Sequence, residues 1–383
     1  LMLEETLLPV DESIVNSTIV LPKQVLGKNI SIHSKINGFP DLEDVRIAIV
    51  GVNELRNSFF NINRYNISEF RKEFYKLYPG NWKYKISDLG DIPNGDSVED
   101  TYFVLKEICQ FLRQINITPV LIGGSHDLTF PIYKSFENSN QWVNITSIDN
   151  MFDFSQNEKL ISGRSYMSSV IMEKPSNLNS FSNLGYQSYL ISQEELDLMD
   201  RLFFESVRLG EILDDNKIAE PYLRDSDIVT FDLKSLSQIS SDNSINYYPN
   251  GFDSRTICGL SRYAGISDRV SVIGFFELPN SIIFHKLLAQ IIWYFIEGFN
   301  CRFNEFPVLT GENFKKFIVT LSDRELIFHK SNKSERWWVE IKVENYLDNK
   351  TKTNSLLSCT HNDYIDACND KLPERWLNAT RRV

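Results

Sequence analysis

The hydrophobic positions of this 383-residue chain follow two patterns, which change near residue 308. Before that point, short runs of aliphatic and β-branched residues alternate with stretches in which apolar residues recur every three or four positions. Short apolar strands between helices are typical of a mainly parallel sheet with helices on both faces. We therefore expect a three-layer α/β/α domain over residues 41–308. Its predicted strands lie at residues 45–50, 119–123, 143–148, 227–231 and 270–274.

Two of the predicted helices carry a capping signature at their start. Ser97 is followed three residues later by Asp100, and Ser192 by Glu195, as in a capping box. Residues 281–299 are apolar nearly all round, which indicates a helix buried between layers. Within it we expect His285 to be a hydrogen-bonded core residue rather than a metal ligand. The helix after Ser97 has one apolar face, formed by Val104, Ile108, Phe111, Leu112 and Ile115.

The two ends of the chain differ from the middle. Residues 1–40 are irregular and mixed, so we expect an N-terminal extension that wraps on the α/β/α domain. Residues 309–383 predict a small β-rich C-terminal appendage, in which Trp337 and Trp338 either pack on its own core or anchor a partner protein. Its alternating, strand-like segments lie at residues 317–321, 325–328 and 337–342.

The charge balance narrows the choice of partner. A formal charge of −11 and a pI near 5.1 disfavour nucleic acids and anionic membranes, because both select basic surfaces. The five cysteines form no CxxC pair, so we expect reduced thiols and neither a disulfide framework nor a thiolate zinc site. We find no signal-peptide pattern and no run of about 18 apolar residues, which favours a cytoplasmic protein.

Candidate chemistry follows three of the predicted strands. Residues 123–126 read Gly-Gly-Ser-His, residues 149–153 read Asp-Asn-Met-Phe-Asp, and residues 232–234 read Asp-Leu-Lys. Alternate residues of an extended segment point to the same side, so Asp149, Met151 and Asp153 share one face, as do Asp232 and Lys234. Because ligands gather at the carboxyl ends of parallel strands, we expect these residues to converge on one pocket.

Five segments in chain order resemble motifs of the ureohydrolase superfamily, which includes arginase, agmatinase and formimidoylglutamase. The resemblance runs from about residue 45 to residue 279 and implies an arginase-like fold. It also implies a homo-oligomer, since these proteins commonly form trimers or hexamers. The matching segments are residues 88–91 (Asp-x-Gly-Asp), 123–126 (Gly-Gly-Asp-His in the family), 149–153 (Asp-Ala-His-x-Asp), 230–234 (Ser-x-Asp-x-Asp) and 277–280 (Glu-Val-Asn-Pro).

The resemblance implies a metal site with one half altered. The family uses two manganese ions and a hydroxide that attacks an amidine or guanidine carbon. At the positions that complete the second ion, this chain has Met151 and Lys234. A thioether is a soft, weak ligand for manganese, and an ammonium has no lone pair to offer. We therefore expect one divalent metal, manganese, or none. The residues that match the ligands of the first ion are His126, Asp149, Asp153 and Asp232.

The charge of the site is compatible with one bound metal ion and with none. The three aspartates contribute −3, Lys234 contributes +1, and one divalent ion would make the site neutral. The alternative is that Lys234 forms salt bridges with the aspartates and no metal binds. Ser125 replaces an aspartate of the family motif, which we expect to weaken the orientation of His126 by removing an acceptor.

Two further residues are candidates for chemistry. Glu277 matches the family residue that clamps the cationic nitrogen of the substrate, or it pairs with Lys234. Tyr166 lies where the family has a proton-shuttling histidine, and its high reference pKa makes it a poor acid at pH 7.

Two functions follow from the resemblance. The first is a divergent ureohydrolase-fold protein that has lost ordinary binuclear hydrolysis, a pseudoenzyme that binds a small cationic amidine or guanidine. The alternative is a formimidoylglutamase- or agmatinase-like hydrolase of linear amidines that uses one metal, or that uses Lys234 as an electrophile or as a base of depressed pKa. A third class, an interaction scaffold, depends on Trp337 and Trp338 being exposed.

Overall fold

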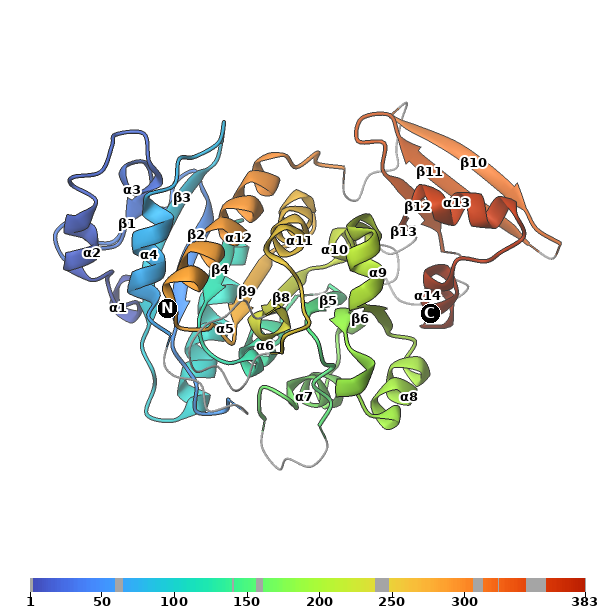
Figure 1. The fold of residues 1–383 in the computed structure, drawn as a ribbon, viewed down its shortest axis with the longest axis horizontal. Helices are drawn as coiled ribbons and strands as arrows, with labels where there is room; N and C mark the ends of the chain where they lie inside the picture. The colour runs from blue at the N-terminus through green and yellow to red at the C-terminus, as the bar shows by residue number, and fades with distance from the viewer. Residues whose placement is uncertain are drawn as a thin grey trace.

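The computed structural model describes residues 3–58, 65–139, 141–155, 161–237, 248–305, 313–322, 324–341 and 356–382. The predicted domain boundary near residue 308 and the last residue of the predicted strand at 337–342 lie outside the described residues. Figure 1 shows the N-terminal extension and the C-terminal appendage at opposite ends of the molecule.

The centre of the molecule is a nine-stranded sheet in the order β1-β3-β2-β4-β9-β8-β5-β6-β7, and every neighbouring pair is parallel. The predicted three-layer α/β/α fold is confirmed. The strands are β1 (Ser31–Ile32), β2 (Val45–Val52), β3 (Lys85–Ile92), β4 (Thr118–Ile122), β5 (Val143–Ile148), β6 (Leu178–Tyr186), β7 (Glu205–Arg208), β8 (Ile228–Asp232) and β9 (Val272–Phe276).

Four strands of this sheet were not recognised in the sequence, namely β1, β3, β6 and β7. In β3 the reason is a buried polar network. The Asp88 carboxylate accepts from Arg71 Nε at 2.9 Å and from the Tyr75 hydroxyl at 2.8 Å, and all three side chains are buried. Because a buried polar residue with partners interrupts the apolar run, β3 lacks the pattern expected of a central strand.

One hydrophobic core lies on each face of the sheet. The first face is covered by α4 (Ile67–Tyr75), α9 (Leu209–Asp214), α10 (Glu220–Asp225), α11 (Ser254–Ile266) and α12 (Ile282–Asn300). The second face is covered by α5 (Val98–Gln114), α6 (Thr129–Lys134), α7 (Tyr166–Met172) and α8 (Gln193–Arg201).

The predicted capping boxes are both present, at Ser97 for α5 and at Ser192 for α8. The predicted apolar face of α5 is wrong in part, because Ile115 is the exposed C-cap residue and Val104 and Phe111 are only half-buried. The most buried stripe instead consists of Thr101, Tyr102, Leu105, Ile108, Cys109 and Leu112.

Helix α12 is the buried helix that the sequence predicted. It packs along α11, and the contact depends on glycine: a Cβ at Gly298 would lie 2.3 Å from the Arg262 carbonyl oxygen. By length and composition α12 alone among the described helices could cross a membrane, yet 56% of its most apolar window is buried inside the protein. His285 is buried and its Nδ1 lies 2.9 Å from the Tyr65 hydroxyl, as expected of a core histidine.

The N-terminal extension is more regular than its sequence indicates. It forms α1 (Leu3–Thr6), α2 (Glu12–Ser17), α3 (Leu26–Asn29) and the edge strand β1. Its backbone joins β3, since His33 N donates to Asp88 O at 2.8 Å and Asp91 N donates to Leu8 O at 2.9 Å. The extension therefore completes one edge of the sheet.

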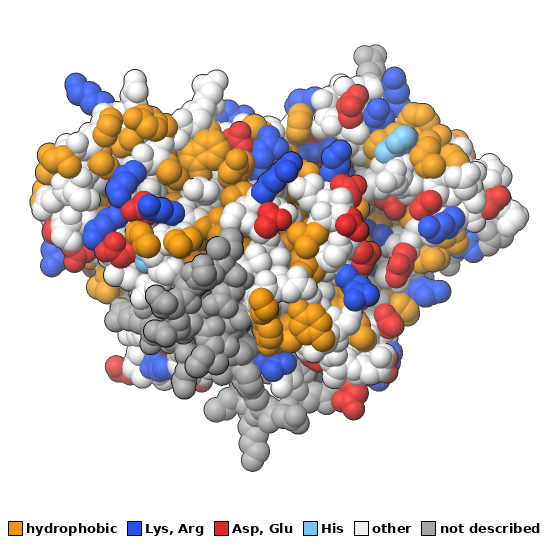
Figure 2. All heavy atoms as spheres, in the orientation of Figure 1, with side chains coloured by type: hydrophobic (Ala, Val, Ile, Leu, Met, Phe, Trp, Pro, Cys, Tyr) orange, Lys and Arg blue, Asp and Glu red, His pale blue; other side chains and the backbone are white. Residues whose placement is uncertain are grey.

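The C-terminal appendage is a separate antiparallel sheet in the order β10-β11-β12-β13, as the alternating pattern predicted. Two helices that were not predicted accompany it. Figure 2 shows a hollow in the outline between this appendage and the main body, and acidic and basic side chains mixed over the face in view. Its elements are β10 (Phe314–Thr320), β11 (Glu325–Ser331), β12 (Trp337–Glu340), β13 (Leu356–Cys359), α13 (His361–Cys368) and α14 (Glu374–Arg382).

The two tryptophans of the appendage have different partners, and both are buried. Trp337 belongs to the core of the appendage and stacks on Tyr364 with ring centroids 4.9 Å apart. Trp338 lies under the guanidinium of Arg224 from α10, at 4.4 Å from the ring centroid. Both residues therefore serve internal packing, and the scaffold hypothesis loses the exposed anchors on which it depended.

Candidate metal centre

Four adjacent strands at the middle of the sheet, in the order β4-β9-β8-β5, bring the candidate residues together. His126 follows β4, Glu277 follows β9, Asp232 ends β8, and Asp149 follows β5. Because the strands are parallel, all four residues lie at the same edge of the sheet, as the sequence predicted.

The four predicted metal ligands converge around one ring nitrogen. His126 Nδ1 lies 3.1 Å from Asp149 Oδ2, 3.1 Å from Asp153 Oδ2 and 3.6 Å from Asp232 Oδ2. All four side chains are buried. Within the described residues, His126 Nδ1 and the Oδ2 atoms of Asp149 and Asp153 have no hydrogen-bond partner apart from these contacts with one another. Buried carboxylates that crowd around a single ring nitrogen are costly, so this donor set is suited to a cation.

A glycine pair shapes the loop that carries His126. Gly123 and Gly124 have φ values of +98° and +79°, a region that side chains disfavour. A Cβ at Gly123 would also lie 2.3 Å from the Val52 carbonyl oxygen. The loop can therefore turn sharply from β4 and direct His126 back toward β5 and β8.

The other groups of His126 are held by neighbouring strands. Its backbone N–H donates to Glu277 Oε1 at 3.0 Å, and its Nε2 lies 3.1 Å from Thr230 Oγ1 and 3.3 Å from the Tyr166 hydroxyl. These contacts leave Nδ1 to face the aspartates, which is the arrangement that orients a metal-binding histidine. Sequence reasoning gave Thr230 no role, although its position two residues before Asp232 places it on the same side of β8.

The serine in the glycine-rich loop has a partner that the sequence did not suggest. Ser125 Oγ donates to the Asp127 carboxylate, which also accepts from the Tyr102 hydroxyl. Burial raises the pKa of Asp127 to about 6, against the hydrogen bonds from Ser125 and Tyr102. The expected weakening of His126 orientation is not supported, because Thr230 and Tyr166 contact its ring.

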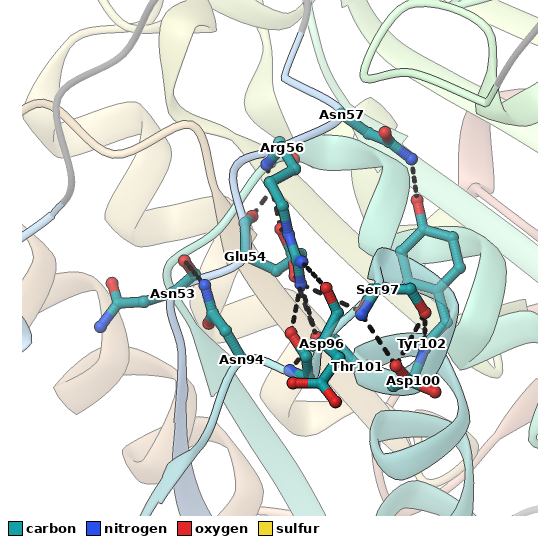
Figure 3. A network of polar contacts seen from close by, with 12 residues as sticks. Asn53, Glu54, Arg56, Asn57, Asn94, Asp96, Ser97, Asp100, Thr101 and Tyr102 are labelled. Carbon is teal, nitrogen blue, oxygen red and sulfur yellow. Dashed lines mark hydrogen bonds and ion pairs between the residues drawn. The ribbon is translucent and has the colours of Figure 1, made fainter.

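A polar network around Glu54 and Arg56 reaches the start of α5 (Figure 3). Glu54 is fully buried; its carboxylate accepts from Arg56 Nη2 at 2.6 Å and from Thr101 Oγ1 at 2.9 Å. Its backbone carbonyl accepts from Ser125 N at 3.0 Å, and Asn57 donates to Tyr102 at 3.0 Å. The network therefore joins the start of α5 to the loop that carries His126.

Lys234 is buried on the β8–β9 side of the centre. Its Nζ lies 3.0 Å from Asp232 Oδ2 and 3.4 Å from Glu277 Oε2. Burial lowers the pKa of Lys234, but the charges of Asp232 and Glu277 outweigh burial and raise the pKa above its usual range. The raised pKa favours the ammonium form of Lys234 at neutral pH and contradicts the alternative in which Lys234 is a base of depressed pKa.

The pKa values of the crowded acidic residues shift in different directions. Burial and then the charges of Asp153 and Asp232 raise the pKa of Asp149 well above its usual range. Burial also favours a higher pKa for Asp232, yet the ammonium of Lys234 outweighs it and lowers the pKa. Burial raises the pKa of Glu277 to about 7, against the opposing charge of Lys234. Burial lowers the pKa of His126, but Tyr166 and the hydrogen bonds with the three aspartates outweigh burial and raise the pKa well above its usual range. Negative charge is thus compensated by the ammonium of Lys234 on one side of the centre and faces the imidazole of His126 on the other.

The two remaining candidate residues are also placed at the centre. Met151 is buried, its N–H donates to Asp149 Oδ1 at 3.1 Å and its carbonyl accepts from Asn183 at 2.6 Å. Tyr166 begins α7 and is fully buried, and burial raises its pKa above the usual range. A proton is therefore held tightly on Tyr166, in agreement with the expectation that it is a poor acid at pH 7.

Solved structures of ureohydrolases share this fold. A Trypanosoma cruzi formiminoglutamase structure with Mn2+ matches with a TM-score of 0.60 and 15% identity, over 73% of this chain and 99% of that chain. A Bacillus subtilis formimidoylglutamase matches with a TM-score of 0.59 and 13% identity, over 69% and 91% of the two chains. The agmatine ureohydrolase of Thermoplasma volcanium matches with a TM-score of 0.54 and 13% identity, over 74% and 96%.

No protein-family model and no curated protein sequence matches the chain. At identities of 13–15% the structural likeness concerns the fold, and it agrees with the five motifs read from the sequence. The chain therefore has the arginase-like fold of the ureohydrolases, with His126, Asp149 and Asp153 placed so that they could hold a metal ion.

Proposed function

We propose that the chain is a divergent member of the ureohydrolase superfamily that binds one divalent cation, manganese, and lacks binuclear hydrolysis. The observation that carries the proposal is the position of Lys234, whose Nζ lies 3.0 Å from Asp232 and 3.4 Å from Glu277. An ammonium repels a metal ion and cannot ligate it. Asp232 would have to serve both ions of a binuclear site, and one of its oxygens already pairs with this cation.

The first half of the centre supports a single ion. One imidazole nitrogen and the carboxylates of Asp149, Asp153 and Asp232 are donors that manganese accepts, and His126 Nε2 is held by Thr230. When bound, the ion would supply Lewis acidity toward a ligand oxygen or nitrogen. The residues themselves hold protons tightly, because burial raises the pKa of both Tyr166 and Asp149.

The proposed ligand is a small cationic amidine or guanidine, in a protein that acts as a pseudoenzyme. Glu277 is the residue that would contact its cationic nitrogen. In this structure Oε1 of Glu277 accepts from His126 N and Oε2 lies beside Lys234. A cationic ligand must therefore displace the ammonium of Lys234 or share the carboxylate with it, which weakens binding.

A second candidate function is a one-metal hydrolase of linear amidines. The charged ammonium of Lys234, which could act as an electrophile, favours it. Incubation with formiminoglutamate, agmatine and arginine separates the two functions. The pseudoenzyme releases neither formamide nor urea, whereas the one-metal hydrolase releases one of them at a rate that Lys234→Ala abolishes.

Metal analysis tests the first proposal. Protein equilibrated with excess manganese and then desalted should retain about one ion per chain, as the ligand set indicates. His126→Asn should retain none, because it removes the nitrogen that the three aspartates face. The matched control is His361→Asn, at an exposed position of the appendage, which should retain one. Two ions in the unmodified protein would refute the proposal.

A further inference from the structure

A basic pocket lies at the amino-terminal ends of the central strands, opposite the metal centre. It has a volume of about 350 Å³ and is formed where β2, β4 and β9 begin and where α5 and α12 end. The metal centre is at the carboxyl ends of the same strands, so the two sites are separated by the length of the strands. Four arginines line the pocket, namely Arg46, Arg113, Arg269 and Arg302.

Three of these arginines lack a counter-ion among the described residues. Arg269 forms a salt bridge with buried Asp227 at 2.8 Å. Arg46, Arg113 and Arg302 make no ion pair within the described ranges and donate only to backbone carbonyls. Of the described residues that line the pocket, Asp268 alone is acidic, and it accepts hydrogen bonds from the N–H groups of residues 304 and 305. The pocket therefore carries an excess of about two positive charges.

The backbone contacts of these arginines leave donors free. Arg113 Nη1 donates to Ser135 O at 3.0 Å, and Arg302 donates to Gly265 O at 3.0 Å and to Val270 O at 2.7 Å. Such contacts complement the carbonyl ends of helices, which accounts for part of the charge. The guanidinium Nε of Arg113, however, is buried and has no hydrogen-bond partner in the described part of the chain. Each guanidinium offers five N–H donors, so several stay available to a ligand.

Burial without a counter-ion also affects the ionisation of two of the arginines. Desolvation lowers the pKa of Arg113 to about 10 and that of Arg302 to about 10, and nearby acidic groups offset only part of this. An anion in the pocket would stabilise both charged forms.

A larger pocket, of about 520 Å³, lies between the appendage and the α/β/α domain, and four Lys or Arg residues and three acidic residues line it. Arg224 Nη2 lies 3.2 Å from Glu220, and Arg336 Nε lies 3.4 Å from the same carboxylate. Two basic groups there share an acidic partner, whereas three guanidinium groups of the basic pocket have no acidic partner among the described residues. The excess of positive charge is therefore greater in the basic pocket.

We propose that the basic pocket binds a small oxyanion with two negative charges, either a phosphate group or a dicarboxylate. Guanidinium groups bind both through paired N–H donors. A small ligand suits the pocket better than an acidic surface of another protein, because Arg113 and Arg302 are recessed and only Arg46 is exposed. The overall charge of −11 makes an uncompensated basic pocket unlike the rest of the molecule.

Isothermal titration calorimetry at low ionic strength tests the proposal with inorganic phosphate and, separately, with succinate. We expect one site per chain for at least one of the two anions, and the tighter of them identifies the ligand class. Arg46→Gln and Arg113→Gln should each weaken binding at least tenfold, which corresponds to about 1.4 kcal/mol. The matched control Arg201→Gln, at an exposed position on α8, should bind as tightly as the unmodified protein.

Several results would overturn the proposal. These are the absence of heat for both anions, or equal binding by the unmodified protein and Arg46→Gln. Circular dichroism and thermal unfolding show whether Arg113→Gln folds. If it does not fold, the test depends on Arg46→Gln, because Arg46 is exposed and its substitution leaves the core intact. A change of oligomeric state on Arg46→Gln, measured by light scattering, would instead show that a second copy of the chain covers the pocket.

Discussion

In the two halves of the metal centre, the pKa values of buried aspartates shift in opposite directions. Around His126, Asp149 and Asp153 share one ring nitrogen, each at 3.1 Å, and burial raises the pKa of Asp149. On the side of Lys234, an ammonium 3.0 Å from Asp232 lowers the pKa of that aspartate instead. An ammonium side chain within salt-bridge distance therefore reverses the effect of burial on the pKa of a neighbouring aspartate.

Replacing both Met151 and Lys234 by metal ligands should allow both halves of the centre to bind a metal ion. Met151→His with Lys234→Asp restores the family residues at both positions, so we expect bound manganese to rise from about one to about two ions per chain. Turnover of an amidine or guanidine should appear with the second ion. Elemental analysis and product assays measure the two effects.

The single change Met151→His is the control for that experiment. It adds a ligand but leaves the ammonium in place, so the metal content should stay near one ion per chain. A second ion in this single variant would show that Lys234 is not what excludes it.

Removing the ammonium alone should destabilise the metal-free protein strongly. Lys234→Ala leaves Asp232 and Glu277 buried without their cation, and we expect a loss of about 3–5 kcal/mol in the free energy of unfolding. Urea denaturation in the presence of a chelator measures it. Lys286→Ala, at an exposed position on α12, is the control and should change the free energy by less than about 0.5 kcal/mol. Equal losses in the two variants would contradict the buried charge pairing.

The metal-free protein should lose stability as the pH rises. The pKa of Glu277 is raised to about 7 from a reference of 4.5, so its contribution is complete below pH 4.5 and is lost as the pH rises through 7. The loss is roughly 3 kcal/mol between pH 4.5 and 8. The raised pKa values of Asp149 and His126 act in the same direction. Denaturation at several pH values should show the free energy of unfolding falling as the pH rises. The fall should be smaller in Glu277→Gln and smaller when manganese is added.

The smallest expected effect concerns the orientation of His126. Thr230→Val removes the hydroxyl 3.1 Å from His126 Nε2, and we expect manganese affinity to fall about tenfold. Thr146→Val is the matched control, because its hydroxyl contacts Ser226 at 2.5 Å and not the centre. Calorimetric titration with manganese compares the two. If both variants lose affinity equally, the hydroxyl of Thr230 does not position the ligand.

Much of the candidate site could be predicted because its signals are local. The strand ends, the alternation of Asp149, Met151 and Asp153, and the capping residue Ser97 each depend on neighbours within a few positions. By contrast, β3 was not recognised as a strand, because Asp88 is buried through contacts with Arg71 and Tyr75 on another element. The helices of the appendage were missed as well, although Thr360 caps α13 with a capping box.

Local sequence patterns were enough to show which donor atoms are present and that parallel strands bring them to the same end of the sheet. The pairing of their charges depends on the tertiary fold: Lys234 contacts Glu277 of the neighbouring strand, and its pKa rises where the sequence allowed a fall. The fold also brings together three guanidinium groups that have no counter-ion among the described residues, from positions far apart in the chain. The physical reason is that Coulomb and hydrogen-bond energies depend on distances of a few ångströms, which are set by which strands and helices are neighbours.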